Sequence, residues 1–445
     1  MNVKRIVTMG VLLAAFTTGL FANGQNEAPV TKAQEGTIEN PITLRFLTWE
    51  TNTTLDYYNE VIAGYEKTHP GIKIKIEKVE SGKADDATKK MDLLMLAGDD
   101  LDIVQCTGNI YASHAKQGLF YPLDSVFPTE NGKTYEDIFN VDTKIDGHYY
   151  GVPNGVLPSI MFFNKDALDK AGLSIPTADW TWDGFREYNK KLTYGEGNNK
   201  VYGSFMPTWS DPVHSYIAMN ETKKDNPLFY DENTPCLGDE TLKNWLQFRY
   251  TLENVDKTQV PYYEVKSMNL SYKDYFMTGK CNILPVFGPW IFGVVSDHTN
   301  FPHDFKVAVS PLPAWKDGPK GWTRAGVETL AVSKTAAHPK EAAKFILYMA
   351  QNTSGSCTKI RGVKNLNSDD IVRILTHGNT KDFDVESIKN TFKNIFYNIT
   401  LTIPEQEPEI LRLFYEEQEK YLVGGETIEE CQANMVNRAQ IIMED

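Results

Sequence analysis

The chain has 445 residues, of which 41% are hydrophobic and 23% charged, and its formal net charge is −14 at pH 7. An acidic chain without runs of lysine and arginine lacks the electrostatic surface that nucleic acid or anionic lipid requires, so we expect neither as a partner. A folded body of about 400 residues exceeds what one hydrophobic core usually holds, which predicts two domains.

Residues 1–22 have the pattern of a secretory signal peptide. Lys4 and Arg5 precede a short apolar run over residues 6–16, and a small residue stands at the expected cleavage point. The apolar run is too short for a membrane span, and no cysteine lies near the cleavage point to carry a lipid anchor. The polar residues 23–40 predict a flexible leader. We therefore expect an exported, periplasmic protein.

Strand and helix patterns alternate at the start of the folded body. The strands are predicted at 42–49, 72–76 and 101–105, and the helices at 55–67 and 86–96. This rhythm is typical of βαβ units with a parallel sheet. In such sheets, ligands bind beyond the carboxyl ends of the strands.

The later part of the chain mixes both patterns. Two strands are predicted within 147–163, with a break at Pro153–Gly155. Further predicted helices are 164–171, 182–192, 241–252 and 339–351, and further predicted strands are 281–287 and 327–332. Residues 193–235 are rich in Gly, Asn, Pro and aromatic residues and predict mostly loop. After residue 366 the pattern is helical.

The five cysteines are widely spaced, and no two of them form a C-x-x-C pair. An odd number leaves at least one thiol outside any disulfide. Cys106 and Cys281 lie in apolar strand patterns and are predicted to be buried. One disulfide among Cys236, Cys357 and Cys431 is possible, and the sequence does not determine which two would pair.

Several segments resemble the extracellular solute-binding proteins of ABC sugar importers, the family of maltose-binding protein. They are 65–75 (YEKTHPGIKIK), 101–104 (LDIV), 118–124 (GLFYPLD), 150–153 (YGVP), 161–166 (MFFNKD), 276–280 (FMTGK), 287–290 (FGPW), 329–333 (TLAVS) and 339–345 (PKEAAKF). Together they cover nearly all of residues 41–362 in the family's order. The region 193–235 carries no family motif.

The resemblance implies an α/β, two-lobed periplasmic-binding-protein fold. Each lobe would hold a mostly parallel sheet flanked by helices, with the ligand cleft between the lobes. The first lobe would comprise 41–155 with 326–361, and the second 156–325 with 362–445. The family implies a monomer without cofactor that binds a sugar or oligosaccharide, closes by a hinge rotation and delivers the ligand to the permease subunits without catalysis.

Sugar rings have apolar C–H faces that stack on aromatic rings and a hydroxyl rim that needs paired donors and acceptors. Trp290 follows an apolar strand and a Gly-Pro turn, and it matches the stacking tryptophan of the family's aromatic motif. The alternative is a core tryptophan that packs at a helix start. We predict ligand contact for Trp290.

Four candidates follow the predicted strands of the first sheet: Trp49, Glu50, Asn109 and Tyr111. The carboxylate of Glu50 could accept from two sugar hydroxyls. It could equally be a carboxylate that a helix N-terminus favours. Asn109 could contact ligand or act as an N-cap.

The remaining candidates lie later in the chain. Trp209 and Asp211 share a loop, where a tryptophan either stacks on a ligand or covers the core. The resemblance places Trp322 and Glu328, with Arg324 between them, beside the cleft. Arg361 precedes a crossover between lobes, where it could pair with a carboxylate or with solvent.

Other chemistry is thinly represented. There is no phosphate-binding loop, H-E-x-x-H or G-x-S-x-G motif. The group His298, His303, Asp297 and Asp304 has ligating side chains, but its Pro- and Asn-containing loop favours a solvated surface over a metal site.

Two alternative functions stay open. One keeps the fold and binds a polyol phosphate, a glycosaminoglycan fragment or a peptide. The other is a secreted carbohydrate-active enzyme, which would need two suitably spaced carboxyls. No carboxylate pair stands out in a recognisable setting.

Overall fold

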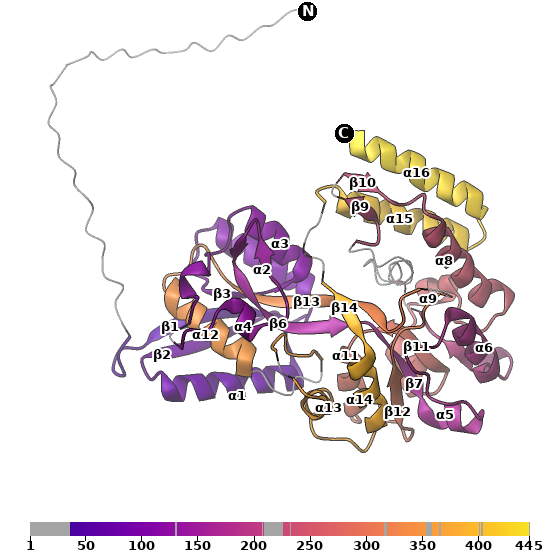
Figure 1. Ribbon diagram of the computed structural model, residues 1–445, viewed down its shortest axis with the longest axis horizontal. Helices are drawn as coiled ribbons and strands as arrows, with labels where there is room; N and C mark the ends of the chain where they lie inside the picture. The colour runs from indigo at the N-terminus through magenta and orange to yellow at the C-terminus, as the bar shows by residue number, and fades with distance from the viewer. Residues whose placement is uncertain are drawn as a thin grey trace, which may run out of the picture. The chain divides into compact units, whose positions relative to one another are not determined.

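The computed structural model describes residues 36–129, 131–206, 208, 226–231, 233–315, 318–352, 358–364, 366–399, 401 and 404–444. Within these residues, the chain forms a six-stranded and a four-stranded sheet, each flanked by helices (Figure 1). The predicted α/β class is confirmed. None of the helices in this part of the chain has the length and apolar character of a membrane span.

The first sheet has the strand order β14-β13-β3-β1-β2, and β6 pairs with residues 325–331 of β13. Its strands are β1 (Ile42–Thr48), β2 (Ile72–Lys78), β3 (Ile103–Thr107), β6 (Gly151–Pro158), β13 (Trp322–Val332) and β14 (Phe396–Asn398). β1 pairs in parallel with β2 and β3, as the βαβ rhythm predicts. β13 runs antiparallel to β3 and β6 because it enters the sheet from the opposite end.

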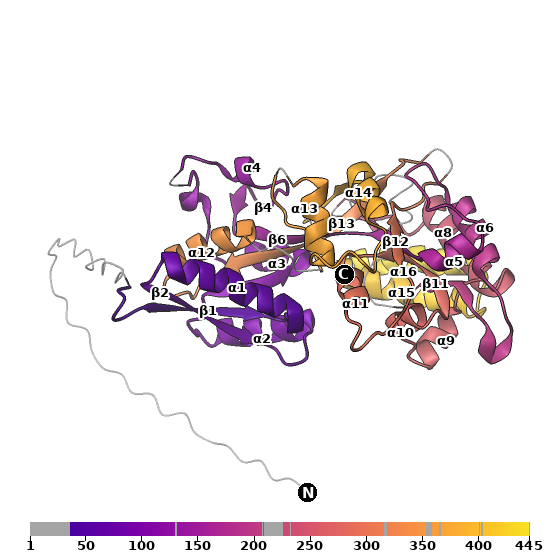
Figure 2. The same ribbon diagram turned by 90° about the horizontal axis from the view of Figure 1, so that it is seen from below.

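Helices cover both faces of the first sheet. They are α1 (Asn52–Thr68), α2 (Ala84–Leu96), α3 (Gly108–Lys116) and α12 (Pro339–Asn352). Successive strand residues point to opposite faces. Phe46 therefore packs with α1 and α12, whereas Leu47 packs with α2 and α3. In Figure 2, α1 and α2 lie along this sheet with α12 beside it.

The second sheet has the order β12-β7-β11-β8. Its strands are β7 (Ile160–Asn164), β8 (Tyr202–Ser204), β11 (Cys281–Phe287) and β12 (Val307–Ser310). Only the β11–β8 pair is parallel, and β7 runs antiparallel to both of its neighbours. The prediction of a mostly parallel sheet therefore does not extend to this sheet. The reason is that β7 arrives directly from β6 of the first sheet, without a crossover helix.

Helices surround the second sheet on both faces. They are α5 (Lys165–Lys170), α6 (Trp182–Leu192), α8 (Glu240–Tyr250), α9 (Tyr262–Ser267), α10 (Tyr272–Met277), α11 (Trp290–Ser296), α13 (Ser368–Thr376), α14 (Val385–Asn394), α15 (Glu407–Leu422) and α16 (Ile428–Glu444). Phe163 faces a core with α6, α8, α15 and α16, and Phe162 faces a core with α11, α13 and α14. The smaller elements are α4 (Tyr135–Ile138), β4 (Lys144–Ile145), β5 (His148–Tyr149), β9 (Phe229–Asp231), β10 (Thr234–Pro235) and a π-helical turn at Thr251–Val255.

Three segments predicted as crossovers lie side by side. In the β6–β13 pair, Leu157 lies opposite Gly326. Val156 and Ile360 exchange backbone hydrogen bonds of 2.7 and 3.0 Å. Figure 1 shows β6 and β13 running from the first sheet toward the second. The lobe limits themselves stay a prediction.

The strand break predicted at Pro153–Gly155 lies elsewhere. β6 continues through these residues, and the chain leaves the first sheet at Ser159. Instead of a break, the register between β6 and β13 shifts so that Asn154 is the extra residue of a β-bulge. The buried positions predicted for Cys106 and Cys281 are confirmed, Cys236 and Cys431 are also buried, and Cys357 lies outside the described residues.

Candidate functional site

Two predicted site residues, Glu50 and Glu328, meet beside the carboxyl ends of β1 and β3. The Nζ atom of Lys359 donates to Glu50 Oε1 at 2.6 Å and also to Glu328 Oε2. Gln105 Nε2 donates to the same two oxygens, at 2.9 and 2.7 Å. We call these four residues the Lys359 cluster.

A shell of neutral groups fixes the orientation of the cluster. Thr48 Oγ1 donates to Gln105 Oε1 at 2.6 Å, which leaves the amide NH₂ of Gln105 directed at the two carboxylates. The Tyr58 hydroxyl accepts from Lys359 Nζ at 3.3 Å and from Asn154 Nδ2 at 2.5 Å. Buried polar groups that are paired in this way hold one arrangement, because any other leaves a donor or acceptor unpaired.

The local fold makes room for Lys359. The bulge at Asn154 lets the side chain of this residue reach the hydroxyl of Tyr58 on α1. At the next position, a Cβ atom on Gly155 would lie 2.2 Å from Lys359 Cδ. Glycine is therefore required where the lysine stem crosses β6.

Burial and neighbouring charges shift the pKa values of Lys359 and Glu328. The side chain of Lys359 is only 2% exposed, whereas those of Glu50 and Glu328 are 11% and 15% exposed. Burial opposes the charge on Lys359, but the carboxylates of Glu328 and Glu50 outweigh it and hold the lysine pKa well above its usual value. Burial raises the pKa of Glu328, and repulsion from the like charge of Glu50 adds to this, against the opposing charge of Lys359.

Trp290 lies at the second sheet, as the first residue of α11. Its side chain is half-buried, with the ring centroid 6.4 Å from that of Phe287. The ring folds back over Gly288, where a Cβ atom would lie 2.1 Å from Trp290 Cζ3. The Gly-Pro turn thus presents an indole with part of its surface exposed, which agrees with either a stacking role or partial packing.

The strand-end candidates divide into surface and core. Trp49 is half-buried, and Asn109 is exposed as the second residue of α3. The N-cap of that helix is Thr107, so the alternative that Asn109 caps it is wrong. Tyr111 is 0% exposed and donates its hydroxyl to the Thr143 carbonyl at 2.7 Å. This burial leaves no ring surface for a ligand, so the prediction of ligand contact is wrong for Tyr111.

The candidates later in the chain divide in a similar way. Trp322 is 1% exposed within β13 and belongs to the core, which corrects its assignment as a ligand contact. Arg361 is half-buried, and its Nη1 donates to the Gln351 carbonyl at 2.8 Å. Burial lowers the pKa of the Arg361 guanidinium. In this structure Arg361 thus bonds a backbone carbonyl, and its pairing with a carboxylate or with solvent stays a prediction. Trp209 and Asp211 lie outside the described residues.

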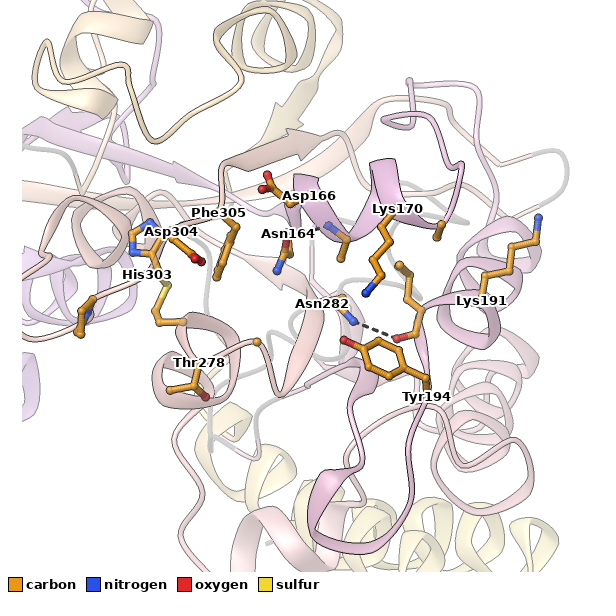
Figure 3. A pocket seen from close by; sticks show the side chains of 16 residues that line it. Asn164, Asp166, Lys170, Lys191, Tyr194, Thr278, Asn282, His303, Asp304 and Phe305 are labelled. Carbon is orange, nitrogen blue, oxygen red and sulfur yellow. Dashed lines mark hydrogen bonds between the residues drawn. The ribbon is translucent and has the colours of Figure 1, made fainter.

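A pocket of about 1120 Å³ lies between α5, the end of α6, α10 and the residues that precede β12 (Figure 3). Its polar lining includes Asp166, Lys170, Lys191 and Asp304. Of the described residues that line it, none is a predicted ligand-binding residue. The pocket is therefore separate from the Lys359 cluster.

The sequence prediction did not identify Lys359, Gln105, Tyr58 and Asn154 as site residues. Gln105 carried a local signal, because it is a polar residue between the apolar Val104 and Cys106 of β3. Lys359 carried none, since it bonds Glu50 across 309 positions of the chain.

Two sheets joined through β6 and β13, with polar groups at the carboxyl ends of β1 and β3, define a two-domain α/β fold of the periplasmic-binding-protein kind. The model of the bacterial extracellular solute-binding protein family matches residues 51–355, and the chain belongs to this family. Members of this family are binding proteins, which agrees with the resemblance noted from the sequence.

Known proteins resemble the chain over most of its length. An arabinooligosaccharide-binding protein of Bacillus subtilis is 25% identical over 310 residues, which cover 67% of this chain and 67% of that protein. The structure of a sugar transporter of Rhizobium etli in an open conformation has a TM-score of 0.72 at 23% identity, covering 90% of this chain and 99% of that chain. An ABC substrate-binding protein of Listeria monocytogenes in complex with cycloalternan has a TM-score of 0.71 at 20% identity, covering 91% and 99%.

Proposed function

We propose that this protein is the substrate-binding component of an ABC importer and that it binds a sugar or oligosaccharide reversibly. The observation that carries the proposal is membership of the extracellular solute-binding protein family. The sugar class is supported by the Bacillus relative, named for arabinooligosaccharide, and by the Listeria structure, which holds cycloalternan.

The chemistry of the described residues suits a neutral, hydroxyl-rich ligand. Trp290 offers part of an indole face for the C–H side of a sugar ring. Glu50 and Glu328 offer carboxylate oxygens at a partly exposed edge, and each can accept from ligand hydroxyls. Trp49, which follows β1, and Asn109, which follows β3, add a half-buried aromatic ring and an exposed amide. We include Trp209 and Asp211 from the sequence prediction.

The balance of charge disfavours an anionic ligand. The Lys359 cluster contains two carboxylates and one ammonium, and that ammonium is already bonded to both acids. A phosphate would meet surplus negative charge there. Arg361 is the residue to examine if the ligand proves to be a polyol phosphate.

Catalysis does not form part of the proposal. A glycosidase needs one carboxyl that donates a proton and one carboxylate that acts on the sugar, placed on opposite sides of the bond. Glu50 and Glu328 instead share the same two donors, Lys359 and Gln105. We expect a bound oligosaccharide to survive long incubation at its original length.

Export and delivery complete the proposal. Residues 1–22 would direct the chain to the periplasm as a signal peptide, and the mature monomer would pass its ligand to the permease subunits of the importer. The lobes 41–155 with 326–361 and 156–325 with 362–445 would rotate about β6, β13 and the segment near Ile360.

A thermal-shift screen of the mature protein, residues 23–445, against mono- and oligosaccharides tests the proposal. A sugar at about one hundred times its dissociation constant should stabilise the folded state by about 2.7 kcal/mol and raise the unfolding midpoint. A clear rise with one class of sugar supports the proposal. A rise only with phosphorylated or acidic compounds would contradict the proposal of a sugar ligand, but not the assignment to the family.

A further inference from the structure

Three potential metal ligands meet at the rim of the second sheet, away from the Lys359 cluster. The ligating atoms of His298, His303 and Asp382 all lie within 4.8 Å of one another. His298 Nε2 lies 2.9 Å from Asp382 Oδ2, and the two imidazole rings are stacked with centroids 4.5 Å apart. The group joins the loop after α11 to the loop that precedes α14.

The hydrogen bonding of His303 prepares one nitrogen as a ligand. Its Nδ1 lies 3.0 Å from the Phe301 carbonyl, which can only accept, so Nδ1 carries the proton. In the neutral ring, Nε2 is then an unprotonated lone-pair donor. This Nε2 is buried and has no hydrogen-bond partner among the described residues. A histidine that ligates a metal usually has this arrangement, with its other nitrogen bonded to a carbonyl or carboxylate.

The position of Asp382 is fixed by backbone pairing. Val307 at the start of β12 donates its N–H to the Asp382 carbonyl at 2.8 Å, and Asp384 donates to the Val307 carbonyl at 2.9 Å. The Asp382 side chain is 11% exposed, and its Oδ2 also accepts from Asn379 Nδ2 at 3.3 Å. A carboxylate held by a second donor is typical of a metal ligand whose orientation is set by its neighbours.

We propose that His298, His303 and Asp382 bind a zinc ion. Two imidazoles and one carboxylate are a ligand set that Zn²⁺ accepts with a fourth position left for water. Tetrahedral Zn²⁺ with bonds of about 2.0–2.1 Å needs ligand atoms roughly 3.3 Å apart, so the side chains must move inward. The His298 side chain is 35% exposed and has room to rotate. His303 also lines the pocket of Figure 3, which provides an entry path.

The ligand set differs from the group that the sequence brought together. Asp297 accepts from the backbone and side-chain nitrogens of Asn300, at 3.1 and 2.7 Å, and so it shapes the loop. Asp304 is exposed. Asp382, which lies about 80 positions further along, takes their place. The group that the sequence suggested, for which we expected a solvated surface, therefore lacks Asp382, which only the fold brings beside the two histidines.

Zinc titration of the chelator-treated mature protein against a chromophoric chelator tests the proposal. The protein must carry no purification tag, because a histidine tag would bind the ion itself. We expect one Zn²⁺ per chain, and we expect Co²⁺ in its place to give visible absorption bands of a four-coordinate ion. His303→Gln and Asp382→Asn should each weaken Zn²⁺ affinity at least about tenfold and abolish the bands.

His148→Gln is the matched control, because His148 also lies beside an aspartate, with Nδ1 3.3 Å from Asp124 Oδ2. Its Zn²⁺ affinity should equal that of the unsubstituted protein. Circular dichroism establishes that each variant is folded, and His298→Gln replaces any variant that is not. Absence of Zn²⁺ binding, or binding that persists unchanged in the folded site variants, would overturn the proposal.

Discussion

Lys359 joins two carboxylates that lie 309 and 31 positions away in the chain. Its side chain is almost fully buried, so the ion pairs are shielded from water and salt. Removal of the lysine would leave Glu50 and Glu328 facing each other with only Gln105 as a shared donor. An uncompensated buried charge is far more costly than the loss of an exposed ion pair.

We therefore expect Lys359→Met to lower the free energy of unfolding by about 3–5 kcal/mol, measured by urea denaturation at pH 7. Lys266→Met is the control. Lys266 pairs with Glu419 at 2.5 Å, but both side chains are largely exposed, at 51% and 41%. Its loss should cost less than about 1 kcal/mol. Equal losses in the two variants would contradict the structural role of the Lys359 cluster.

Trp290 is the residue on which the sugar proposal most directly depends. We expect Trp290→Ala to weaken binding of the sugar found by thermal shift by about 1–3 kcal/mol, because the stacking surface is lost. Isothermal titration calorimetry measures the change in affinity.

Trp180→Ala is the matched control for Trp290. Trp180 is also half-buried and belongs to the part of the chain around the second sheet, but its ring packs on Phe163, Phe185 and Tyr188. This variant should lose stability and keep its affinity. An unchanged affinity in Trp290→Ala would assign that tryptophan to packing alone.

At the scale of elements, α6 is attached to the end of the π-helical turn by one ion pair. Arg186 Nε and Nη2 donate to the two oxygens of Asp256 at 2.5 and 2.9 Å. The hydrogen bonds from Arg186 hold the pKa of Asp256 below its ordinary value of 3.8. A carboxyl with a lowered pKa in the folded state stabilises the fold above its unfolded pKa, and this contribution is lost as the pH falls through the folded pKa.

We expect Asp256→Asn to lower the free energy of unfolding by about 1–2 kcal/mol at pH 7, since the Arg186 side chain is partly exposed. The difference from the unsubstituted protein should shrink as the pH falls below about 4 and vanish in stronger acid. Urea denaturation at several pH values measures this. Glu187→Gln, which removes an exposed pair with Lys190 on the same helix, should cost less than about 0.5 kcal/mol. A pH-independent loss in Asp256→Asn would contradict the assignment.

At the scale of the whole molecule, the proposal requires a change of shape. The two sheets are joined by β6, β13 and the segment around Ile360, which pair with one another. Short connecting segments that lie side by side allow two lobes to rotate as rigid bodies. We expect saturating sugar to reduce the radius of gyration of the mature protein, measured by small-angle X-ray scattering.

The Trp290→Ala variant should reach the reduced radius of gyration only at a higher sugar concentration, raised by the same factor as its loss of affinity. A sugar that raises the unfolding midpoint without changing the radius of gyration would leave binding in place and contradict closure.

Local patterns in the sequence determined much of the fold. The helix predicted at 182–192 and the strand predicted at 281–287 have the bounds that the structure shows. Periodicity of 3.6 or 2 residues reports which face of an element is buried, and it depends only on near neighbours. Segments that resemble the family, and that occur in the family's order along the chain, were enough to identify the class of protein, which the family match then confirmed.

The tertiary structure decided the chemistry of the site. Tyr111 follows strand β3 and Trp322 begins strand β13, positions that suggested contact with a ligand. Both are core residues, because the packing of other elements determines their burial. Lys359 reaches Glu50, and Asp382 reaches His298, across separations at which the sequence carries no periodic signal. Contacts of this kind exist only once the sheets have assembled, since chain closure brings together groups that local propensity does not relate.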